Sequence, residues 1–396
     1  MVTEYAEGTY VIDNEYAKIW CHLGEKAENA AYCYGGTRTV SVDMPAEEVY
    51  NKLIYLGKYE SGLKNKLINL LIKDGVFAPL DDRMPDGFEG SVVEGGRCII
   101  QPKSEELFAA VTDTTHQDHK KVLDSIFADL GEFLNSLGGS LKLTPDFGRF
   151  AGLADMLHKY TENVLGIDCN DGGCGGKASY TSTGIIQAAE TMGAEKESPI
   201  TIIGSAGACG TGVLDYFIEK GYTDVAVCDL YYDNTDEGKK FARELEEKNI
   251  KVLHSCDGKF TSECLGRGGM IIAITVGGEF LNSNVSAIKD DSILLMAHNE
   301  CIRVCDESFK RIDELLKEKN IIIIPGQLLT FGGALTSRIE RFYRESKKGT
   351  YFDKPLAHSG VRLAADAVMK KYCTGSYGKN LFKQIYAYTN PKNNNR

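Results

Sequence analysis

A glycine-rich stretch between two short apolar runs is the part of the sequence whose residue types point most directly to chemistry. The runs Ile200–Ile203 and Val225–Cys228 flank Gly204–Gly212, which reads GSAGACGTG. Glycines at a strand-to-helix turn let the backbone approach a pyrophosphate, which then binds the unpaired N–H groups at the helix N-terminus. Asp229 follows the second run, about where a ribose-binding acid is expected. The pattern predicts a dinucleotide site.

The predicted cofactor is NAD. An aspartate at position 229 would repel the 2′-phosphate of NADP, and no arginine follows it directly. The spacing is G-x-x-G-x-x-G and not the strict G-x-G-x-x-G, so a surface turn without a ligand is the alternative. Besides Asp229, the cofactor-binding residues expected here are Gly204, Ser205, Ala206, Gly207, Ala208, Cys209 and Gly210.

The elements around these residues predict an α/β protein of two domains. After residue 176, short apolar runs alternate with helical patterns, which favours a doubly wound parallel sheet over 177–344. Residues 1–176 are expected to form an α/β substrate domain, with helical spacing over 46–73 and 104–138. We expect tight turns at both Gly-Gly pairs of this domain, a helix from Asp155 to Leu165, and packing of 345–396 back on the first domain, with a cleft between the domains.

Composition limits the classes of partner. The 396 residues carry a net charge of −11, which argues against nucleic acid or an anionic membrane as the main partner. The sequence begins without a signal-peptide pattern, and no apolar run reaches membrane-spanning length. The 12 cysteines are scattered and are interpreted as reduced packing residues, with no metal site predicted. A cytoplasmic enzyme acting on a small molecule is the expectation.

Several short segments, taken together and in order, resemble motifs of the glutamate/leucine/phenylalanine/valine dehydrogenase superfamily. The segments are Gly35–Arg38, Thr144–Gly148, Asn163–Gly166, Thr181 with Gly184, Ala297–Asn299 and Phe331–Ala334. The resemblance implies that Gly36 contacts substrate, that Asp146 is the catalytic aspartate, and that Thr181 and Asn299 contact the cofactor. It also implies a homo-oligomer. Without it, Gly35-Gly36 is only a turn and Asp146 a helix cap.

The sequence departs from this family at three places. Arg97, in Glu94-Gly95-Gly96-Arg97, stands where the family has a lysine, and Thr330 stands where it has an asparagine. The best match to the family's other lysine is Lys64, which lies much farther from Arg97 than in the family, so that Lys73–Ser91 is interpreted as an insertion. Taken without the family, Arg97 is a surface arginine beside a turn.

The exchange of lysine for arginine bears on the chemistry. A desolvated lysine can have its pKa lowered toward neutrality and can pass protons, whereas arginine stays charged in proteins. Arginine can still hold a carboxylate in a bidentate fork. The hypothesis is therefore that Asp146 is the acid/base, Lys64 a carboxylate anchor or proton carrier, and Arg97 a substrate clamp.

The predicted function is an NAD-dependent dehydrogenase acting on a CH–NH2 donor, interconverting an amino acid and its 2-oxo or imino acid. Two alternatives stay open. One is a biosynthetic reductase of a specialised imine or carbonyl on the same fold, favoured by Arg97 and by the insertion. The other is a nucleotide-binding relative without catalysis, favoured by the missing lysine.

Overall fold

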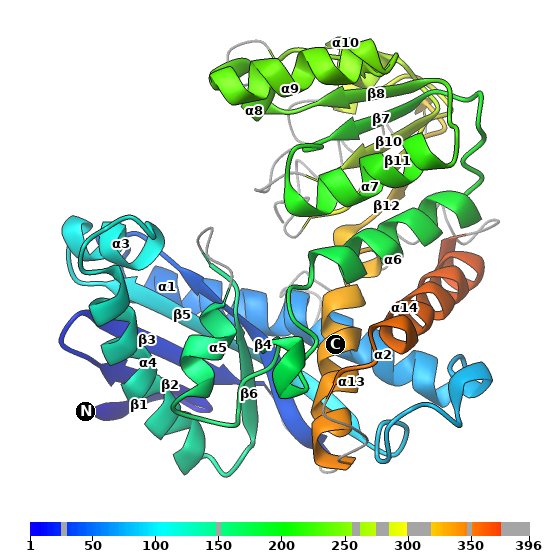
Figure 1. Ribbon diagram of the computed structural model, residues 1–396. Helices are drawn as coiled ribbons and strands as arrows, with labels where there is room; N and C mark the ends of the chain where they lie inside the picture. The colour runs from blue at the N-terminus through cyan, green and yellow to red at the C-terminus, as the bar shows by residue number, and fades with distance from the viewer. Residues whose placement is uncertain are drawn as a thin grey trace. The chain divides into compact units, whose positions relative to one another are not determined.

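The computed structural model describes residues 1–24, 30–147, 152–255, 262–274, 285–298, 318–346 and 351–373. The chain divides into two compact units, each a six-stranded sheet with helices (Figure 1). Unit 1 comprises Met1–Lys177 and Ala334–Gly360, and unit 2 comprises Ala178–Gly333 and Val361–Arg396. None of the described helices is long and apolar enough to cross a membrane.

The sheet of unit 1 is mixed, in the order β1-β2-β3-β5-β4-β6. Pairing is antiparallel from β1 to β5, and the last three strands, β5, β4 and β6, run parallel. Their carboxyl ends therefore meet at one edge, where connecting loops can bring side chains together. The strands are β1 (Val2–Ala6), β2 (Thr9–Asp13), β3 (Ala17–Leu23), β4 (Ala30–Thr39), β5 (Val92–Pro102) and β6 (Leu141–Pro145).

Helices cover both faces of this sheet because its strands bury side chains on both sides. One face packs on α3 (Glu105–Thr112), α4 (His119–Ser136) and α5 (Leu153–His158) through a large apolar core. On the other face, a smaller core joins α1 (Ala46–Tyr55) and its continuation to the sheet. That continuation is a π-helical turn, η1 (Leu56–Gly62), followed by α2 (Leu63–Lys73), and α13 (Gly332–Ser346) contacts the same face.

The sheet of unit 2 is wholly parallel, in the order β12-β11-β10-β7-β8-β9. This is the doubly wound order of dinucleotide-binding sheets, and the strand order reverses between β7 and β10. The strands are β7 (Ile200–Ile203), β8 (Val225–Cys228), β9 (Lys251–Val252), β10 (Met270–Ala273), β11 (Ile293–Met296) and β12 (Ile322–Ile324). Its described helices include α6 (Ala178–Thr191), α7 (Ala208–Glu219), α8 (Leu230–Asn234), α9 (Asp236–Glu247) and α10 (Ser262–Gly266).

Short helical turns and one long helix complete the description. Helix α14 (Lys354–Val368) continues into a π-helical turn, η6 (Met369–Cys373). The single-turn helices are η2 (Ala78–Leu80), η3 (Cys169–Asp171), η4 (Val285–Ala287) and η5 (Gly326–Leu328). Of residues 345–396, expected to pack on the first domain, 347–350 and 374–396 lie outside the described residues, and the division into units assigns the segment up to Gly360 to unit 1.

The two Gly-Gly pairs of unit 1 lie within strands, and the expectation of tight turns was wrong. Gly35 and Gly36 are inside β4, and Gly95 and Gly96 are inside β5. The glycines serve close packing: a Cβ on Gly95 would lie 2.6 Å from the backbone nitrogen of Gly62 in η1. A side chain at this position would therefore push η1 away from the sheet.

The helix expected from Asp155 to Leu165 was also too long. Helix α5 ends at His158, and the chain then runs beside the edge strand β6. The Leu143 amide donates to the carbonyl of Asn163, and the Leu165 amide donates to the carbonyl of Leu143. Pairing with the exposed edge of β6 takes up these backbone groups, so tertiary contact overrides the helical pattern.

Candidate active site

Three of the residues singled out in the sequence lie on the parallel strands β4 and β5 and just after β6. Gly36 pairs with Thr144, and the two strands on either side carry Arg97 and, just after β6, Asp146. A Cβ on Gly36 would lie 3.1 Å from Arg97 Nη1, so the guanidinium lies directly over this glycine. A side chain at position 36 would therefore crowd the guanidinium group of Arg97.

A buried carboxylate, Glu60, joins the cations of this region. Its Oε1 lies 3.5 Å from Arg97 Nη1 and 3.8 Å from Lys64 Nζ, and its Oε2 lies 3.6 Å from Arg38 Nη2. Arg97 is 3% exposed and Lys64 is 8% exposed. Arg97 Nη1 also donates to Ser61 Oγ at 3.4 Å. Two buried cations and the partly exposed Arg38 thus share one buried carboxylate.

The pKa values of this cluster follow from burial and charge. Burial alone would raise the pKa of Glu60, but Arg97, Lys64 and Arg38 outweigh it and hold the pKa below its ordinary value. Burial lowers the pKa of Lys64; Glu60 opposes this shift, while Arg97 and Arg38 add to it. Lys64 is therefore an ammonium group that releases its proton more readily than an ordinary lysine.

Asp146 follows β6 and influences the same cluster through its charge. It is exposed, its backbone amide donates to the carbonyl of Thr37 at 3.3 Å, and its charge acts to raise the pKa of Lys64. An exposed carboxylate beside a buried, proton-releasing lysine and a buried arginine can exchange protons with solvent while the cations hold an anionic substrate. The structure thus brings together Gly36, Lys64, Arg97 and Asp146.

A cluster of hydroxyl groups surrounds Tyr34, which lies two residues before Gly36 in β4 and on the same face of the sheet. Tyr34 donates to Ser337 Oγ at 2.8 Å and lies 3.0 Å from Thr144 Oγ1. Lys177 Nζ donates to Tyr34 Oη at 2.6 Å and to Thr144 Oγ1 at 2.5 Å. Burial would lower the pKa of Lys177, but Tyr34, Cys174 and Glu340 outweigh it, so the pKa lies above its ordinary value.

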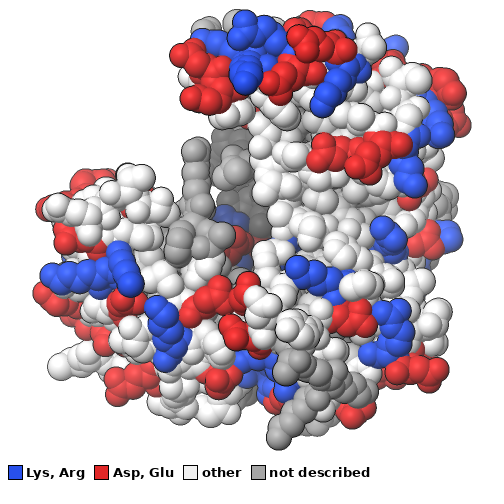
Figure 2. Space-filling model, viewed as in Figure 1, with Lys and Arg blue, Asp and Glu red and all other residues white. Residues whose placement is uncertain are grey.

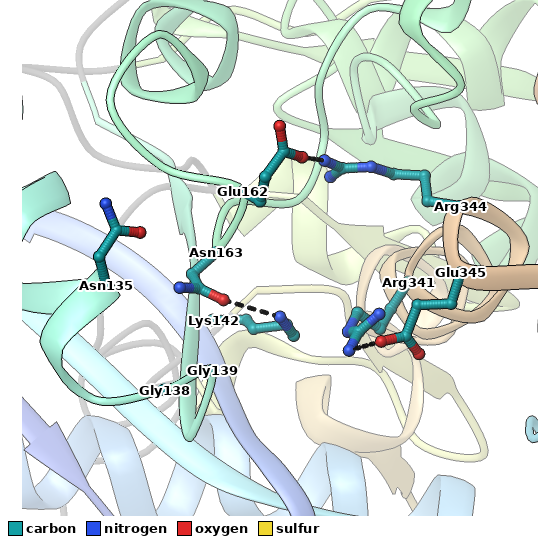
Figure 3. Close-up of a pocket in the computed structure, with 9 residues that line it drawn as sticks. All are labelled: Asn135, Gly138, Gly139, Lys142, Glu162, Asn163, Arg341, Arg344 and Glu345. Carbon is teal, nitrogen blue, oxygen red and sulfur yellow. Dashed lines mark hydrogen bonds and ion pairs between the residues drawn. The ribbon is translucent and has the colours of Figure 1, made fainter.

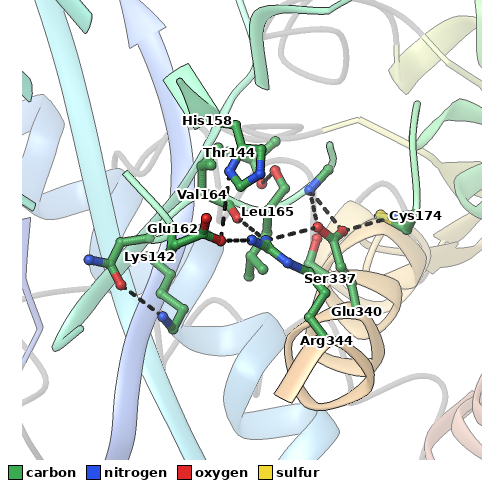
Figure 4. Close-up of polar contacts among 12 residues, drawn as sticks. Lys142, Thr144, His158, Glu162, Val164, Leu165, Cys174, Ser337, Glu340 and Arg344 are labelled. Carbon is green, nitrogen blue, oxygen red and sulfur yellow. Dashed lines mark hydrogen bonds and ion pairs between the residues drawn. The ribbon is translucent and has the colours of Figure 1, made fainter. Parts of the chain in front are cut away.

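Helix α13 anchors the neighbouring loops through one buried carboxylate (Figure 4). Glu340 is fully buried and accepts the backbone amide of Gly166 at 2.8 Å and that of Cys174 at 3.1 Å. Arg344 Nη1 lies 3.7 Å from Glu340 and donates to the carbonyl of Val164 at 2.9 Å. The helix thereby fixes the segment that leads from β6 to Lys177.

Sequence reasoning missed Glu60, Tyr34, Lys177 and Ser337 as members of this region. One signal was present: Glu60 and Lys64 are four residues apart, a spacing that places two side chains on one helix face. Tyr34 directly precedes the Gly-Gly pair, and Lys177 directly follows another. Ser337 gave no local signal, because only the return of α13 to unit 1 brings it to Tyr34.

The glycine turn of unit 2 joins β7 to α7. Gly204 has φ 82°, a left-handed conformation that glycine adopts without strain. A Cβ on Gly210 would lie 2.7 Å from the Cα of Ser205, so this glycine lets α7 pack against the turn. Gly207 is exposed and precedes α7, and among the described residues a Cβ there would have only the Gly204 carbonyl oxygen, 3.6 Å away, within 4 Å. The helix N-terminus is therefore open to a ligand.

Other residues expected at the cofactor have varied surroundings. Ser205 is fully buried, with its hydroxyl 2.8 Å from that of Tyr232, so its side chain faces the interior. Ala208 is exposed, and the carbonyl of Cys209 accepts the hydroxyl of Ser182 in α6, next to Thr181. Asn299 lies outside the described residues.

Asp229 connects the end of β8 to the glycine turn. Its Oδ2 accepts the backbone amide of Ala206 at 2.9 Å, and its Oδ1 accepts that of Tyr231 at 2.9 Å, capping α8. A carboxylate has about four acceptor positions, so further hydroxyl groups can still bind it. Leu230 and Tyr231 beside it are 41% and 40% exposed. These two hydrogen bonds thus hold the Asp229 carboxylate beside the glycine turn.

Taken together, the mixed sheet with its returning helix and the doubly wound parallel sheet define a two-domain α/β dehydrogenase fold. No model of a known protein family matches the sequence.

Solved structures of amino acid dehydrogenases share this fold. L-tryptophan dehydrogenase from Nostoc punctiforme matches with a TM-score of 0.59 and 14% identity, over 94% of this chain and 93% of that one. Glutamate dehydrogenase from Peptoniphilus asaccharolyticus gives 0.58 and 16% identity, over 94% and 84%. The leucine-bound hetero-hexameric enzyme from Thermus thermophilus gives 0.61 and 14%, over 94% and 82%. The resemblance to the glutamate/leucine/phenylalanine/valine dehydrogenase superfamily is confirmed at the level of the fold.

Proposed function

We propose that this protein is an NAD-dependent oxidoreductase that interconverts an amino acid and its 2-oxo or imino acid. The observation that carries the proposal is that Lys64 and Arg97 share the carboxylate of Glu60, while the charge of Asp146 acts on Lys64. The two cations are buried, and Asp146 is exposed. A carboxylate-binding pair beside an acid/base is what a 2-amino acid requires, because its carboxylate must be held while protons leave its nitrogen.

Each residue then has a separate task. Arg97 holds the substrate carboxylate in a bidentate fork, for which its planar guanidinium is suited. Lys64, whose pKa burial lowers, carries a proton at Nζ to and from the reacting nitrogen or its hydrated adduct. Asp146 exchanges that proton with solvent. Gly36 has no side chain that would block the substrate from the Arg97 guanidinium group, which lies over β4 at this point.

Unit 2 supplies the residues that fit a dinucleotide. The N-terminus of α7 at Gly207 offers backbone amides to a pyrophosphate, and Asp229 offers acceptors to ribose hydroxyls. The exposed Leu230 and Tyr231 provide apolar surface for an adenine ring. When bound, NAD accepts a hydride from the substrate carbon. We also propose that the chain forms a homo-oligomer.

A screen of amino acids tests the proposal. The protein is mixed with NAD and single amino acids at alkaline pH, and the absorbance of the reduced nicotinamide is followed. Turnover of at least one amino acid with NAD, and slower turnover with NADP, is expected. Complete inactivity across the panel, with NAD bound in calorimetry, would contradict the proposed reaction.

Glu60 favours a second candidate function. Because this carboxylate already neutralises Arg97 and Lys64 in part, the cluster also suits a substrate with a polarised C=N or C=O group and no free carboxylate. Such an enzyme would be a biosynthetic reductase of an imine or carbonyl. Oxidation of NADH by cyclic imines, without turnover of any amino acid, would identify it, and NAD binding without turnover of either class would indicate a non-catalytic relative.

A further inference from the structure

A second polar cavity lies in unit 1, and the proposed function does not use it (Figure 3). It has a volume of about 510 Å³ and lies where α13 approaches β6 and the chain that follows α5. Its lining residues are Asn135, Gly138, Gly139, Lys142, Glu162, Asn163, Arg341, Arg344 and Glu345. All of them belong to unit 1, so the cavity is complete within that unit.

Lys142 is a buried cation at the centre of this pocket. The residue is 4% exposed, and its Nζ donates to Asn163 Oδ1 at 2.9 Å. Its Nζ also lies 5.8 Å from the centre of the Tyr32 ring. Within the described part of the chain, no carboxylate oxygen lies within the 4.0 Å of an ion pair with it. A buried ammonium without a carboxylate is costly, and such groups usually have a counter-ion.

Two arginines from α13 add to this positive charge. Both line the pocket, and Arg341 lies beside Lys142 while Arg344 extends toward Glu162 (Figure 3). Arg341 pairs with Glu345, and Arg344 pairs with Glu162, and the side chains of these two acids are 48% and 79% exposed. The buried Nε of Arg341 has no hydrogen-bond partner within the described part of the chain. The carboxylates of Glu162 and Glu345 thus lie toward water, whereas the buried carboxylate of Glu340 lies 3.7 Å from Arg344.

The electrostatics of Lys142 agree with this geometry. Burial, followed by the charges of Arg341 and Arg344, lowers its pKa to about 7, and Glu162 opposes the shift only in part. Near neutral pH the empty pocket therefore holds Lys142 partly deprotonated, and a bound anion would restore its charge.

We propose that this pocket binds a small oxyanion, a carboxylate or phosphate group, with Lys142 as its main contact and Arg341 and Arg344 beside it. Gly138 and Gly139 present no side chains here, and a Cβ on Gly139 would lie 3.9 Å from Lys142 Nζ, so this glycine borders the ammonium group. The pocket is separate from the candidate active site, because Asp146 lies four residues farther along the chain, about 13 Å at the rise of a strand.

Thermal unfolding of the full chain tests the site. The probes are inorganic phosphate and malonate, each compared with chloride at equal ionic strength. Phosphate or malonate should raise the Tm of the wild type by several degrees beyond chloride, and should leave the Tm of Lys142→Met at its chloride value. Lys120→Gln, which removes an exposed lysine of the same unit, should respond as the wild type does. A stronger response to phosphate identifies a phosphate ligand, and a stronger response to malonate a carboxylate.

Two results would overturn the proposal: a wild type that responds equally to all three salts, or a Lys142→Met variant that keeps the response. Methionine has nearly the volume of lysine and removes the unpaired charge, so this variant should unfold at the wild-type temperature or above it in chloride. The test therefore does not depend on a weakened fold.

Calorimetry of malonate binding to the wild type, in two buffers of different ionisation enthalpy, gives a second measurement; malonate is used because its carboxylates stay ionised above pH 7, whereas phosphate itself gains or loses a proton there. Binding should take up protons near pH 7, and affinity should fall as pH rises from 7 to 9. The charged groups around Lys142 are Arg341, Arg344, Glu162 and Glu345, whose types ordinarily keep their charge in this range. His158 lies 3.9 Å from Glu162, so His158→Asn is a control variant that should retain the proton uptake. Binding without uptake, or uptake lost in that variant, would contradict the role of Lys142.

Discussion

Glu60 sets the charge balance of the candidate active site. One buried carboxylate faces Arg97, Lys64 and Arg38, so the cluster keeps an excess of positive charge that a substrate carboxylate can neutralise. The same carboxylate opposes the lowering of the Lys64 pKa. Glu60 therefore governs both how an anion binds and when Lys64 releases its proton.

The pH profile of catalysis should respond to Glu60→Gln. If neutral Lys64 accepts a proton during deamination, kcat/KM rises with pH through its pKa. Removing the negative charge of Glu60 lowers that pKa further, so the rise should move to lower pH. The measurement is kcat/KM against pH, with Glu89→Gln, an exposed acid of the same unit, as the control. An unshifted profile would show that Lys64 is not the titrating group.

Asp146→Asn should reduce turnover and leave cofactor binding intact. Loss of a general acid/base costs about 100-fold or more in kcat. Asn preserves the shape and the backbone contact with Thr37. Steady-state kcat and the Kd for NAD are measured together, with exposed Asp82→Asn as the control. Turnover near that of the wild type would make Asp146 a structural residue.

Cofactor preference should depend on Asp229. Replacing it by alanine removes acceptors for the ribose and a charge that repels a 2′-phosphate, so NAD binding should weaken more than NADP binding. Asp229 also caps α8, and Asp229→Ser retains a capping oxygen for the amide of Tyr231. Both variants should show the same loss of NAD preference in Kd measurements. Preference for NADP in the wild type would refute this role.

At the scale of elements, the close approach of η1 to β5 positions Glu60 and Lys64. Gly95 makes this approach possible, because the backbone of η1 occupies the place of its side chain. π-Helical turns occur frequently at functional sites, and this one carries Glu60 and Ser61. The Gly-Gly pairs therefore act on the site through packing between elements.

Gly95→Ala should weaken both the fold and the site. The added methyl group overpacks the contact with η1, which costs roughly 1–3 kcal/mol of stability, and it should raise KM because Lys64 moves away from Arg97. Gly90→Ala is the matched control, since no atom lies within 4 Å of a Cβ there. Denaturant unfolding and steady-state kinetics measure the two effects. Equal stability of both variants would contradict the packing role of Gly95.

At the scale of the whole molecule, the chain leaves unit 1 at Lys177 and returns at Ala334. The returning segment supplies Ser337 and Glu340, described above, and Arg338, which is 1% exposed. Arg338 donates to Asn69 Oδ1 at 2.6 Å and to the carbonyl of Phe88 at 3.1 Å, so it ties α2 to the 74–91 segment. On the face shown in Figure 2, acidic and basic side chains are interspersed.

A fragment of residues 1–177 should therefore fail to fold stably by itself. Without the segment 334–360, the buried partners of Arg338 and Glu340 are left unsatisfied, and each such group costs about 1–3 kcal/mol. A fusion of 1–177 to 334–360 through a flexible linker should restore a cooperative unfolding transition. Far-UV circular dichroism during thermal unfolding compares the two proteins. A cooperative transition in the short fragment would show that α13 is dispensable.

Sequence alone determined the features that depend on local pattern. The glycine turn after Ile200–Ile203, the helix that follows it and the acid after the next strand are written in consecutive residues, because each needs only its neighbours to form. Short apolar runs likewise indicated the parallel sheet of unit 2. Motifs in family order pointed to Gly36, Lys64, Arg97 and Asp146, which the structure places together.

Only the tertiary structure decided the features that depend on contacts between segments far apart in the sequence. The Gly-Gly pairs are strand residues because β4 and β5 pair with each other and receive η1, which no local pattern encodes. The helix after Asp155 stops at His158 because the edge of β6 takes up the following backbone. Ser337 meets Tyr34 only because the chain returns to unit 1. Burial and charge are sums over such neighbours, so the pKa values of Lys64 and Lys142 arise only after folding.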